Sequence, residues 1–340
     1  MSNLRMELGA KSYDIIVERG ALGRLSAWTD TSRKALIVTD DGVPEQYVRT
    51  VAAQFPKGTP VVVKQGEGAK SFPVLRFLCE KLLELKFSRS DVVVALGGGV
   101  MGDLAGFAAA SYMRGIGFLN LPTTTLSQID SSIGGKVAIN LNGVKNCVGA
   151  FYQPELVVAD SDVFASLSRR HYCNGLAEAV KAGLIGDSGL FELFESGDID
   201  SRIDEIVLRS LAVKKAVVEQ DEKEQGLRKL LNLGHTIGHG VESVCGLRAE
   251  QGEPGLFHGE AVAVGMLPMI DDAGLRERTK RVFERLGIDT DIPYDPDQVY
   301  EVMTRDKKAH GGSITIVRVK EPGEAYLQDI PVSGLMKYLG

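Results

Sequence analysis

The sequence has little cysteine, and its four cysteines (Cys79, Cys147, Cys173 and Cys245) lie far apart without a CxxC spacing. Small secreted domains depend on closely spaced disulfide-forming cysteines, and thiolate zinc sites commonly use CxxC pairs. Neither arrangement is indicated here. We therefore expect free, buried thiols.

Long apolar runs and an excess of positive charge are also lacking. No run reaches the roughly 20 residues of a membrane span, and the N-terminus alternates apolar and polar residues like a strand pair rather than a signal peptide. This predicts a cytoplasmic protein without a membrane partner. The net charge of −6 argues against nucleic acid as the main partner, because phosphate backbones need a basic face. The negative net charge still allows a small anionic substrate to be bound by a local group of cations.

Strand-like and helix-like segments alternate in the first half of the chain. The β-branched, strand-like runs cover residues 34–42, 59–68, 91–99, 117–125 and 156–160. Helix-like segments such as 71–87 separate them, which predicts a parallel sheet covered by helices on both faces. From about residue 166 to 306 the apolar period is helical, and a short strand-like piece follows at 313–327. We expect an α/β domain over residues 1–162 and a mainly α-helical domain over residues 163–340.

Ligands of open parallel sheets bind at the carboxyl ends of the strands, so the loops after residues 40, 66, 97 and 122 are candidates. Glycines 97–99 end a strand and begin a helix, whose N–H groups and dipole can bind a pyrophosphate. A strand-to-helix turn without a ligand would have the same sequence pattern. Asp40 can reach a nucleotide ribose or serve only as a turn residue. The long polar segment 121–136 is typical of a functional loop.

Several lysines and arginines lie beside glycine, asparagine or a carboxylate in otherwise apolar surroundings. For any one of them a solvated surface position is the ordinary explanation. Lys136, Lys145 and the adjacent Asn146 lie in glycine-flanked loops, where a cation is free to meet an anion. Such groups, if they converge, would bind a phosphate and a carboxylate through charge-assisted hydrogen bonds.

Three of the five histidines, His235, His239 and His258, lie in glycine-bearing, helix-like segments. Rings four residues apart share one helix face, which is compatible with a structural pair and with metal ligands. A zinc site with three protein ligands and one open position could combine a histidine from each segment with the carboxylate of Glu178, which has Lys181 on the same helix face. The HExxH pattern of zinc proteases is absent.

The segment LLNLGHTIGHGVE, residues 230–242, poses a second question. Gly234 and Gly238 would each cost a helix interior about 1 kcal/mol relative to alanine. We interpret residues 228–242 as one continuous helix in which the two glycines keep open the space beside the histidine rings.

Six motifs occur in one order between about residues 34 and 312. They are ALGGGVMGDLAGFAA, PTTTLSQIDSSIGGKVAINLNGVKN, GLAEAVK, DEKEQGLRKLLNLGHTIGHGVE, FHGEAVAVGM and DKK. Together they resemble the 3-dehydroquinate synthases, a family of the sugar-phosphate cyclase superfamily. The resemblance implies an N-terminal NAD-binding α/β domain and a C-terminal, mainly α-helical metal- and substrate-binding domain.

The resemblance also implies roles for particular residues. The implied ligands of a zinc or cobalt ion are Glu178, His235 and His258. The implied NAD contacts are Asp40, Glu67, Lys70, Gly98, Gly99, Asp103, Thr123, Thr124 and Lys145. The implied substrate-binding and catalytic residues are Asp130, Lys136, Lys145, Asn146, Lys181, Lys214, Arg228, Asn232, His239 and Lys307, with Lys308 as the alternative to Lys307. A homodimer is implied, in which Arg114 reaches the neighbouring active site.

Members of this family are lyases of the shikimate pathway that convert 3-deoxy-D-arabino-heptulosonate 7-phosphate (DAHP) to 3-dehydroquinate and phosphate. They oxidise C5 with NAD+, eliminate phosphate, reduce the ketone again and close the ring by an intramolecular aldol step. The alternatives are a 2-epi-5-epi-valiolone or 2-deoxy-scyllo-inosose synthase and a metal-dependent alcohol or glycerol dehydrogenase. Substrates of the other cyclases lack a carboxylate, so Arg228, which can bind one in bidentate fashion, favours DAHP. A non-catalytic NAD-binding regulator is disfavoured, because every expected ligand position is occupied.

Overall fold

In the computed structural model, which describes residues 2–250, 255–304 and 312–339, the chain divides into two compact units. The N-terminal unit is Met1–Ser168 and the C-terminal unit is Arg169–Gly340. Within the described residues, no helix is both long enough and apolar enough to cross a membrane.

A seven-stranded sheet forms the centre of the N-terminal unit, in the order β1-β2-β9-β6-β5-β3-β4. The strands are β1 (Ser2–Met6), β2 (Tyr13–Val17), β3 (Ala35–Asp40), β4 (Gly58–Val63), β5 (Val92–Gly97), β6 (Gly117–Pro122) and β9 (Leu156–Ala159). Strand β1 is antiparallel to β2, and all other neighbours are parallel. The predicted parallel sheet and N-terminal strand pair are thus confirmed.

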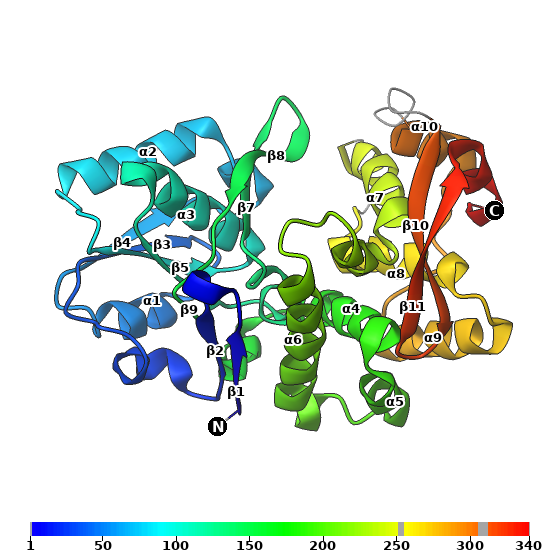
Figure 1. The fold of residues 1–340 in the computed structure, drawn as a ribbon, viewed down its shortest axis with the longest axis horizontal. Coiled ribbons are helices and arrows are strands. Elements are labelled where there is room, and N and C mark those ends of the chain that lie inside the picture. Colours follow the sequence, from blue (N-terminus) through cyan, green and yellow to red (C-terminus); the bar gives the residue numbers. More distant parts are fainter. Residues whose placement is uncertain (1, 251–254, 305–311, 340) are drawn as a thin grey trace. The chain divides into compact units, whose positions relative to one another are not determined.

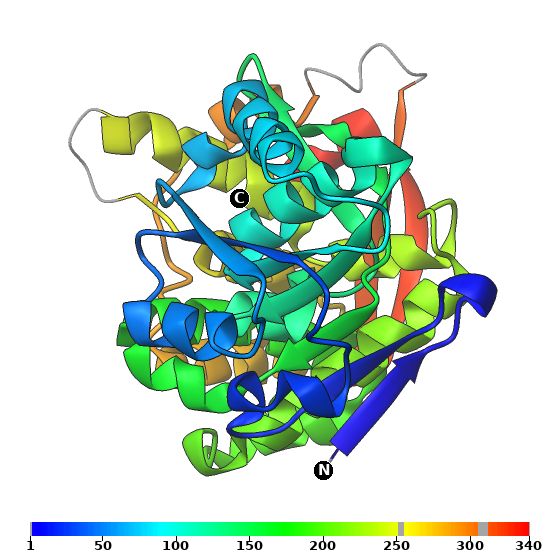
Figure 2. The same ribbon diagram turned by 90° about the vertical axis from the view of Figure 1, so that its left-hand side faces the viewer.

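Helices cover both faces of this sheet (Figures 1 and 2). Helices α2 (Phe72–Glu84) and α3 (Gly99–Ser111) lie on one face and α1 (Glu45–Ala52) lies on the other. Because both faces are covered, every residue of β5 is buried, which explains its continuous apolar run. Strand β3 lies between β4 on one side and β5 on the other, so the chain changes direction across the sheet after β4. The carboxyl ends of β3 and β5 therefore meet at a topological switch point, a common ligand site.

The segment after β6 differs from the predicted loop. Residues Ser127–Ser131 form a π-helical turn, and a hairpin of β7 (Lys136–Leu141) and β8 (Val144–Phe151) follows. The hairpin packs against α3 and stands beside it in Figure 1. The expectation of buried thiols is wrong in part, because Cys147 on β8 is exposed while Cys173 and Cys245 are buried.

The C-terminal unit is mainly helical, as predicted. Its helices are α4 (Arg169–Gly186), α5 (Ser188–Ser196), α6 (Ile203–Gln220), α7 (His235–Glu250), α8 (His258–Met266), α9 (Ala273–Leu286) and α10 (Pro296–Thr304). The strand-like piece near the C-terminus is an antiparallel hairpin of β10 (Ser313–Glu321) and β11 (Glu324–Pro331).

The predicted continuous helix over residues 228–242 is wrong. Residues Leu227–Asn232 form a 3₁₀-helix, η9, and α7 begins only at His235. Gly234 between them has a φ of +78°, a left-handed conformation that glycine adopts without strain. Gly234 is therefore the residue at which the chain turns into α7.

The proposed reason for the glycines is also wrong, because the space beside them is filled. A Cβ at Gly238 would lie 2.8 Å from the carbonyl oxygen of Ala261 on α8, and a Cβ at Gly265 would lie 2.1 Å from that of Gly234. Real Cβ atoms do not come this close to backbone oxygens. These glycines thus allow the backbones of α7 and α8 to touch.

This packing predicts opposite effects for two glycines of the same helix. Gly238→Ala should lower the free energy of unfolding by about 1–3 kcal/mol, because the added methyl group overpacks the contact with α8. A Cβ at Gly246 would have no atom of the described residues within 4 Å, so Gly246→Ala should raise it by up to about 1 kcal/mol through helix propensity. Thermal unfolding of both variants beside the unsubstituted protein measures the difference, and equal shifts for the two would contradict the packing argument.

Candidate functional site

Three histidine rings converge in the C-terminal unit. His235 begins α7, His239 lies one turn later, and His258 begins α8. Ligand nitrogens of the three rings all lie within 4.8 Å of one another. The ring centroids of His235 and His258 are 5.3 Å apart, a distance that the close contact between α7 and α8 makes possible.

Glu178 on α4 brings a buried carboxylate to these rings. Its Oε1 lies 3.6 Å from Nε2 of His235 and 3.3 Å from Nε2 of His258. Its Oε2 is in ion-pair contact with the ammonium of Lys181, which lies one turn later on the same helix and is 3% exposed. The structure therefore brings together the three predicted metal ligands and two predicted substrate residues, Lys181 and His239.

The other ring nitrogens of two histidines have their own partners. Nδ1 of His235 lies 3.1 Å from the carbonyl oxygen of Leu233, and Nδ1 of His258 lies 3.4 Å from a carboxylate oxygen of Glu242. A backbone carbonyl or a carboxylate at this position is the usual outer partner of a metal-binding histidine. Both Nε2 atoms are thereby directed toward Glu178.

The charges of the cluster depend strongly on burial. Burial raises the pKa of the Glu178 carboxyl, but Lys181 and the two histidines outweigh it and hold this pKa well below its ordinary value. Burial and the charge of Lys181 lower the pKa of His235 to about 3. Burial also disfavours charge on His258, but the carboxylates of Glu178 and Glu242 outweigh it and raise the pKa of His258 to about 9.

A divalent metal ion fits this donor set. Oε2 of the Glu178 carboxylate is in ion-pair contact with Lys181. Oε1 is buried and accepts no hydrogen bond of good geometry from the described residues, and buried polar atoms rarely stay so. Ligand atoms around a tetrahedral zinc lie about 3.4 Å apart, close to the observed 3.6 and 3.3 Å. His239, by contrast, is exposed. Glu178, His235 and His258 could hold the ion, and His239 lies close enough to be an alternative ligand.

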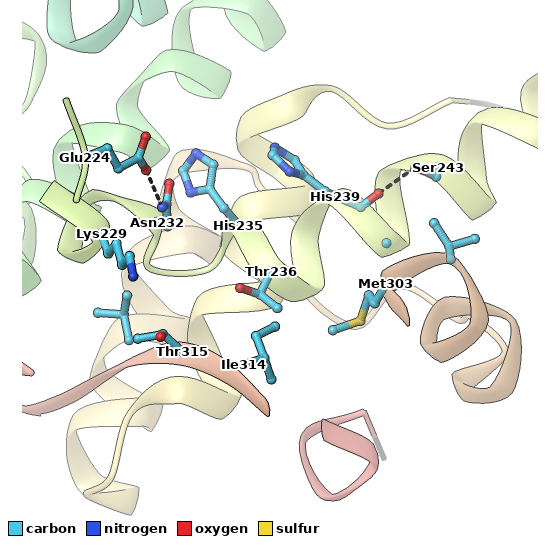
Figure 3. Close-up of a pocket in the computed structure, with 13 residues that line it drawn as sticks. Glu224, Lys229, Asn232, His235, Thr236, His239, Ser243, Met303, Ile314 and Thr315 are labelled. Carbon is cyan, nitrogen blue, oxygen red and sulfur yellow. Dashed lines mark hydrogen bonds between the residues drawn. The ribbon is translucent and has the colours of Figure 1, made fainter. Parts of the chain in front are cut away.

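A cavity of about 610 Å³ adjoins the cluster, and Figure 3 shows the side chains that line it. His235, His239 and Asn232 contribute to its lining, together with Lys229 and Glu224. Asn232 donates a hydrogen bond of 2.7 Å from its side-chain amide to Oε1 of Glu224, drawn dashed in Figure 3. Glu224 was not among the predicted site residues, although it lies in the charged run Asp-Glu-Lys-Glu at the start of one of the six motifs. A positive φ of 59° places it in a turn next to the cavity.

Two predicted cationic residues are buried in the same unit. Arg228 on η9 is 2% exposed and donates a hydrogen bond to the carbonyl oxygen of Glu222, and Lys214 on α6 is 9% exposed. Neither contributes to the lining of the 610 Å³ cavity. The predicted Lys307 and its alternative Lys308 lie outside the described residues.

A second group of predicted residues gathers at the switch point of the N-terminal unit. Helix α3 begins at Gly99 without a side-chain cap, so its first N–H groups can bind an anion. A Cβ at Gly97 would lie 3.7 Å from Oδ2 of Asp40 at the end of the adjacent strand. Burial raises the pKa of Asp40. Thr123 donates its backbone N–H to the carbonyl of Gly97 at 2.9 Å, and Thr124 faces Gly98.

Lys70 organises a polar cluster close to the start of α3. Its side chain is 4% exposed, and its ammonium lies 2.7 Å from Oδ2 of Asp103 and 3.3 Å from Oε1 of Glu67. It also donates a hydrogen bond to the side-chain oxygen of Asn146 on β8. Asp103, Asn146 and Lys136 line a cavity of about 440 Å³ in this unit. Three of the predicted NAD residues, Glu67, Lys70 and Asp103, thus lie close to two predicted substrate residues, Asn146 and Lys136.

Three further predicted residues take different positions. Asp130 lies in the π-helical turn and Lys145 lies exposed on β8. Arg114 is exposed beyond the far end of α3. Since a helix of 13 residues is about 20 Å long, Arg114 is well separated from the glycine loop of its own unit.

Family models and a full-length relative name the same family for this chain. The family model described as 3-dehydroquinate synthase N-terminal matches residues 60–174, and the one described as 3-dehydroquinate synthase C-terminal matches residues 175–309. The 3-dehydroquinate synthase of Streptococcus suis (strain 05ZYH33) is 38% identical over 99% of this chain and 99% of its own length.

Solved structures of two other cyclases are also similar. A 2-deoxy-scyllo-inosose synthase complexed with carbaglucose-6-phosphate, NAD+ and Co2+ is 25% identical with a TM-score of 0.87, covering 99% of both chains. The 2-epi-5-epi-valiolone synthase ValA from Streptomyces hygroscopicus subsp. jinggangensis 5008, with NAD+ and Zn2+ bound, is 25% identical with a TM-score of 0.85, covering 96% of this chain and 95% of its own. The identity to the 3-dehydroquinate synthase of Streptococcus suis, 38%, is higher than the identity to either of these cyclases, 25%. The chain belongs to the 3-dehydroquinate synthase family.

Proposed function

We propose that this protein is a 3-dehydroquinate synthase that converts DAHP to 3-dehydroquinate and phosphate. The observation that carries the proposal is the buried Glu178 carboxylate facing the Nε2 atoms of His235 and His258, in a chain that matches 3-dehydroquinate synthases over 99% of its length. Residues 1–162 would form the NAD-binding domain and residues 163–340 the metal- and substrate-binding domain.

The N-terminal unit supplies the residues for NAD. Backbone N–H groups at the start of α3 would hold the pyrophosphate, and Asp40 would accept a hydrogen bond from a ribose hydroxyl. Lys70 and Asp103 fix the neighbouring loop through their 2.7 Å ion pair. The bound dinucleotide supplies a hydride acceptor, which the reaction regenerates.

The C-terminal unit supplies the residues for the metal and for the substrate. Glu178, His235 and His258 would hold zinc or cobalt, which supplies Lewis-acid polarisation of substrate hydroxyl groups. Lys181 keeps Glu178 ionised, and His239, Asn232 and Glu224 present polar atoms to substrate from the cavity wall. We assign the substrate carboxylate to Arg228, since a guanidinium can bind it with two hydrogen bonds, and we extend the proposal to Lys214 and Lys307 as further contacts.

A homodimer and a cytoplasmic location complete the proposal. Arg114 is exposed and lies at the opposite end of α3 from the glycine loop. That position suits a contact with the active site of a neighbouring subunit.

An assay of phosphate release tests the proposed reaction. With NAD+ and zinc or cobalt, the purified protein should release one phosphate for each DAHP consumed and show no lasting absorbance at 340 nm, because the hydride returns to the substrate. Release from glucose 6-phosphate or a heptulose phosphate in place of DAHP would assign the protein to another cyclase. Lasting NADH with an alcohol would indicate a dehydrogenase.

Substitutions within the cluster test the ligand set. His258→Ala and Glu178→Gln should each reduce bound metal to well below one ion per chain, whereas His239→Ala should retain the metal and lose turnover. Elemental analysis after dialysis measures the metal content. Glu192→Gln, an exposed position on α5, is the matched control. Metal loss in His239→Ala together with full retention in Glu178→Gln would show that the three histidines are the ligands.

The pKa of His258 predicts that the metal competes with a proton. The pKa is raised to about 9 without a metal, so at pH 7 the ring is protonated and must lose its proton to bind. His235, with a pKa of about 3, is already neutral. Apparent affinity should therefore rise by up to tenfold per pH unit and level off near pH 9. Calorimetry in two buffers of different ionisation enthalpy should detect the release of about one proton; no release at pH 7 would contradict the assignment.

A further inference from the structure

We propose that Asn140 is a positioning residue that connects the loop of Glu67 and Lys70, here called the NAD loop, to the β7–β8 hairpin. The inference rests on the proposed function, because it assigns Asn140 the task of holding Glu67 and Asn146 in place. Asn140 lies on β7, half-buried, two residues before the turn of the β7–β8 hairpin.

The hairpin ladder is irregular at this residue. The pairing is regular from Lys136↔Phe151 to Ile139↔Val148, and the next pair is Leu141↔Val144. Asn140 alone therefore opposes Lys145, Asn146 and Cys147, which form a bulge on β8. Bulges beside active sites commonly redirect a side chain, and here the bulge contains the predicted ligand-binding residues Lys145 and Asn146.

The side chain of Asn140 replaces the missing ladder hydrogen bond. Its Oδ1 accepts the backbone N–H of Asn146 at 2.8 Å. Asn146 has a φ of +56°, a left-handed conformation that costs energy and needs support from its surroundings. In this conformation its side-chain oxygen accepts a hydrogen bond from Lys70. Asn140 thus supports the backbone that directs Asn146 toward Lys70.

The other half of the same amide holds the NAD loop. Nδ2 of Asn140 donates to Oε1 of Glu67 at 2.8 Å, and its backbone N–H donates to the carbonyl of Lys70 at 2.9 Å. A backbone N–H can only donate and a carboxylate can only accept, so the Asn146 N–H and the Glu67 carboxylate determine the orientation of the amide. A single side chain therefore connects both loops, because its amide has a donor on one atom and an acceptor on the other.

Two substitutions separate the two halves of this role. Asn140→Ala removes both hydrogen bonds. Asn140→Asp keeps an acceptor for Asn146 but places a carboxylate against Glu67, where like charges repel. The control is Asn142→Gly, at a φ of +49° in the turn of the same hairpin, where glycine is tolerated without strain.

The measurements are the dissociation constant of NAD+, the KM and kcat for DAHP, and hydrogen exchange of the Asn146 amide. For Asn140→Ala we expect NAD+ binding to weaken about five- to tenfold and KM to rise by a similar factor, because each loop loses one hydrogen bond. The Asn146 amide should exchange faster, and kcat should change by less than about threefold. For Asn140→Asp we expect weaker NAD+ binding with KM and exchange close to those of the unsubstituted protein. Asn142→Gly should leave all of them within about twofold.

The inference is overturned if Asn140→Ala leaves both constants and the exchange rate unchanged, or if Asn142→Gly causes the same losses, since the hairpin as a whole would then be responsible. Failure of the proposed function has a different signature. In that case the unsubstituted protein would not bind NAD+ or release phosphate from DAHP, while the exchange of Asn146, which needs no ligand, would still report on Asn140.

Discussion

The backbone contact between α7 and α8 is the constraint on which the candidate metal site depends. Gly234, Gly238 and Gly265 have no side chains to separate the two helices, and a Cβ at any of them would overlap backbone atoms of the other helix or of the turn that leads into it. Helices usually lie 8–10 Å apart because side chains intervene. Without this close approach, His235 and His258 could not both reach the single carboxylate of Glu178.

Burial of that carboxylate is the second requirement. An isolated buried carboxylate would be costly and would take up a proton. Lys181 lies three residues later on α4, in contact with Oε2, and keeps the group ionised. The pair therefore leaves Oε1 as a negatively charged ligand atom toward the histidines. Glu242 has a related effect on His258, since a carboxylate at Nδ1 makes Nε2 the more basic ligand.

Much of this arrangement could be predicted from the sequence. Continuous β-branched runs predicted the parallel strands, because burial on both faces leaves an unambiguous apolar signal. The order of the strands, and hence the proximity of Asp40 to Gly97, depends on contacts between distant segments that a local pattern does not contain. The β7–β8 hairpin escaped prediction because its residues are largely exposed and its ladder is interrupted at Asn140. Glu224 escaped because a turn and a fraying helix end share the same charged composition.

Glycine was the residue type most easily misread. In GHTIGHG the glycines suggested open space beside the histidine rings. The protein's own atoms lie where a Cβ would be, since Ala261 and Val262 of α8 lie beside Gly238. A missing side chain is the same signal in sequence whether a ligand, a helix or a neighbouring loop fills the space. Only the packed structure distinguishes them, and here it shows that Gly234 and Gly238 bring predicted ligand-binding residues together by letting the backbones of α7 and α8 approach each other.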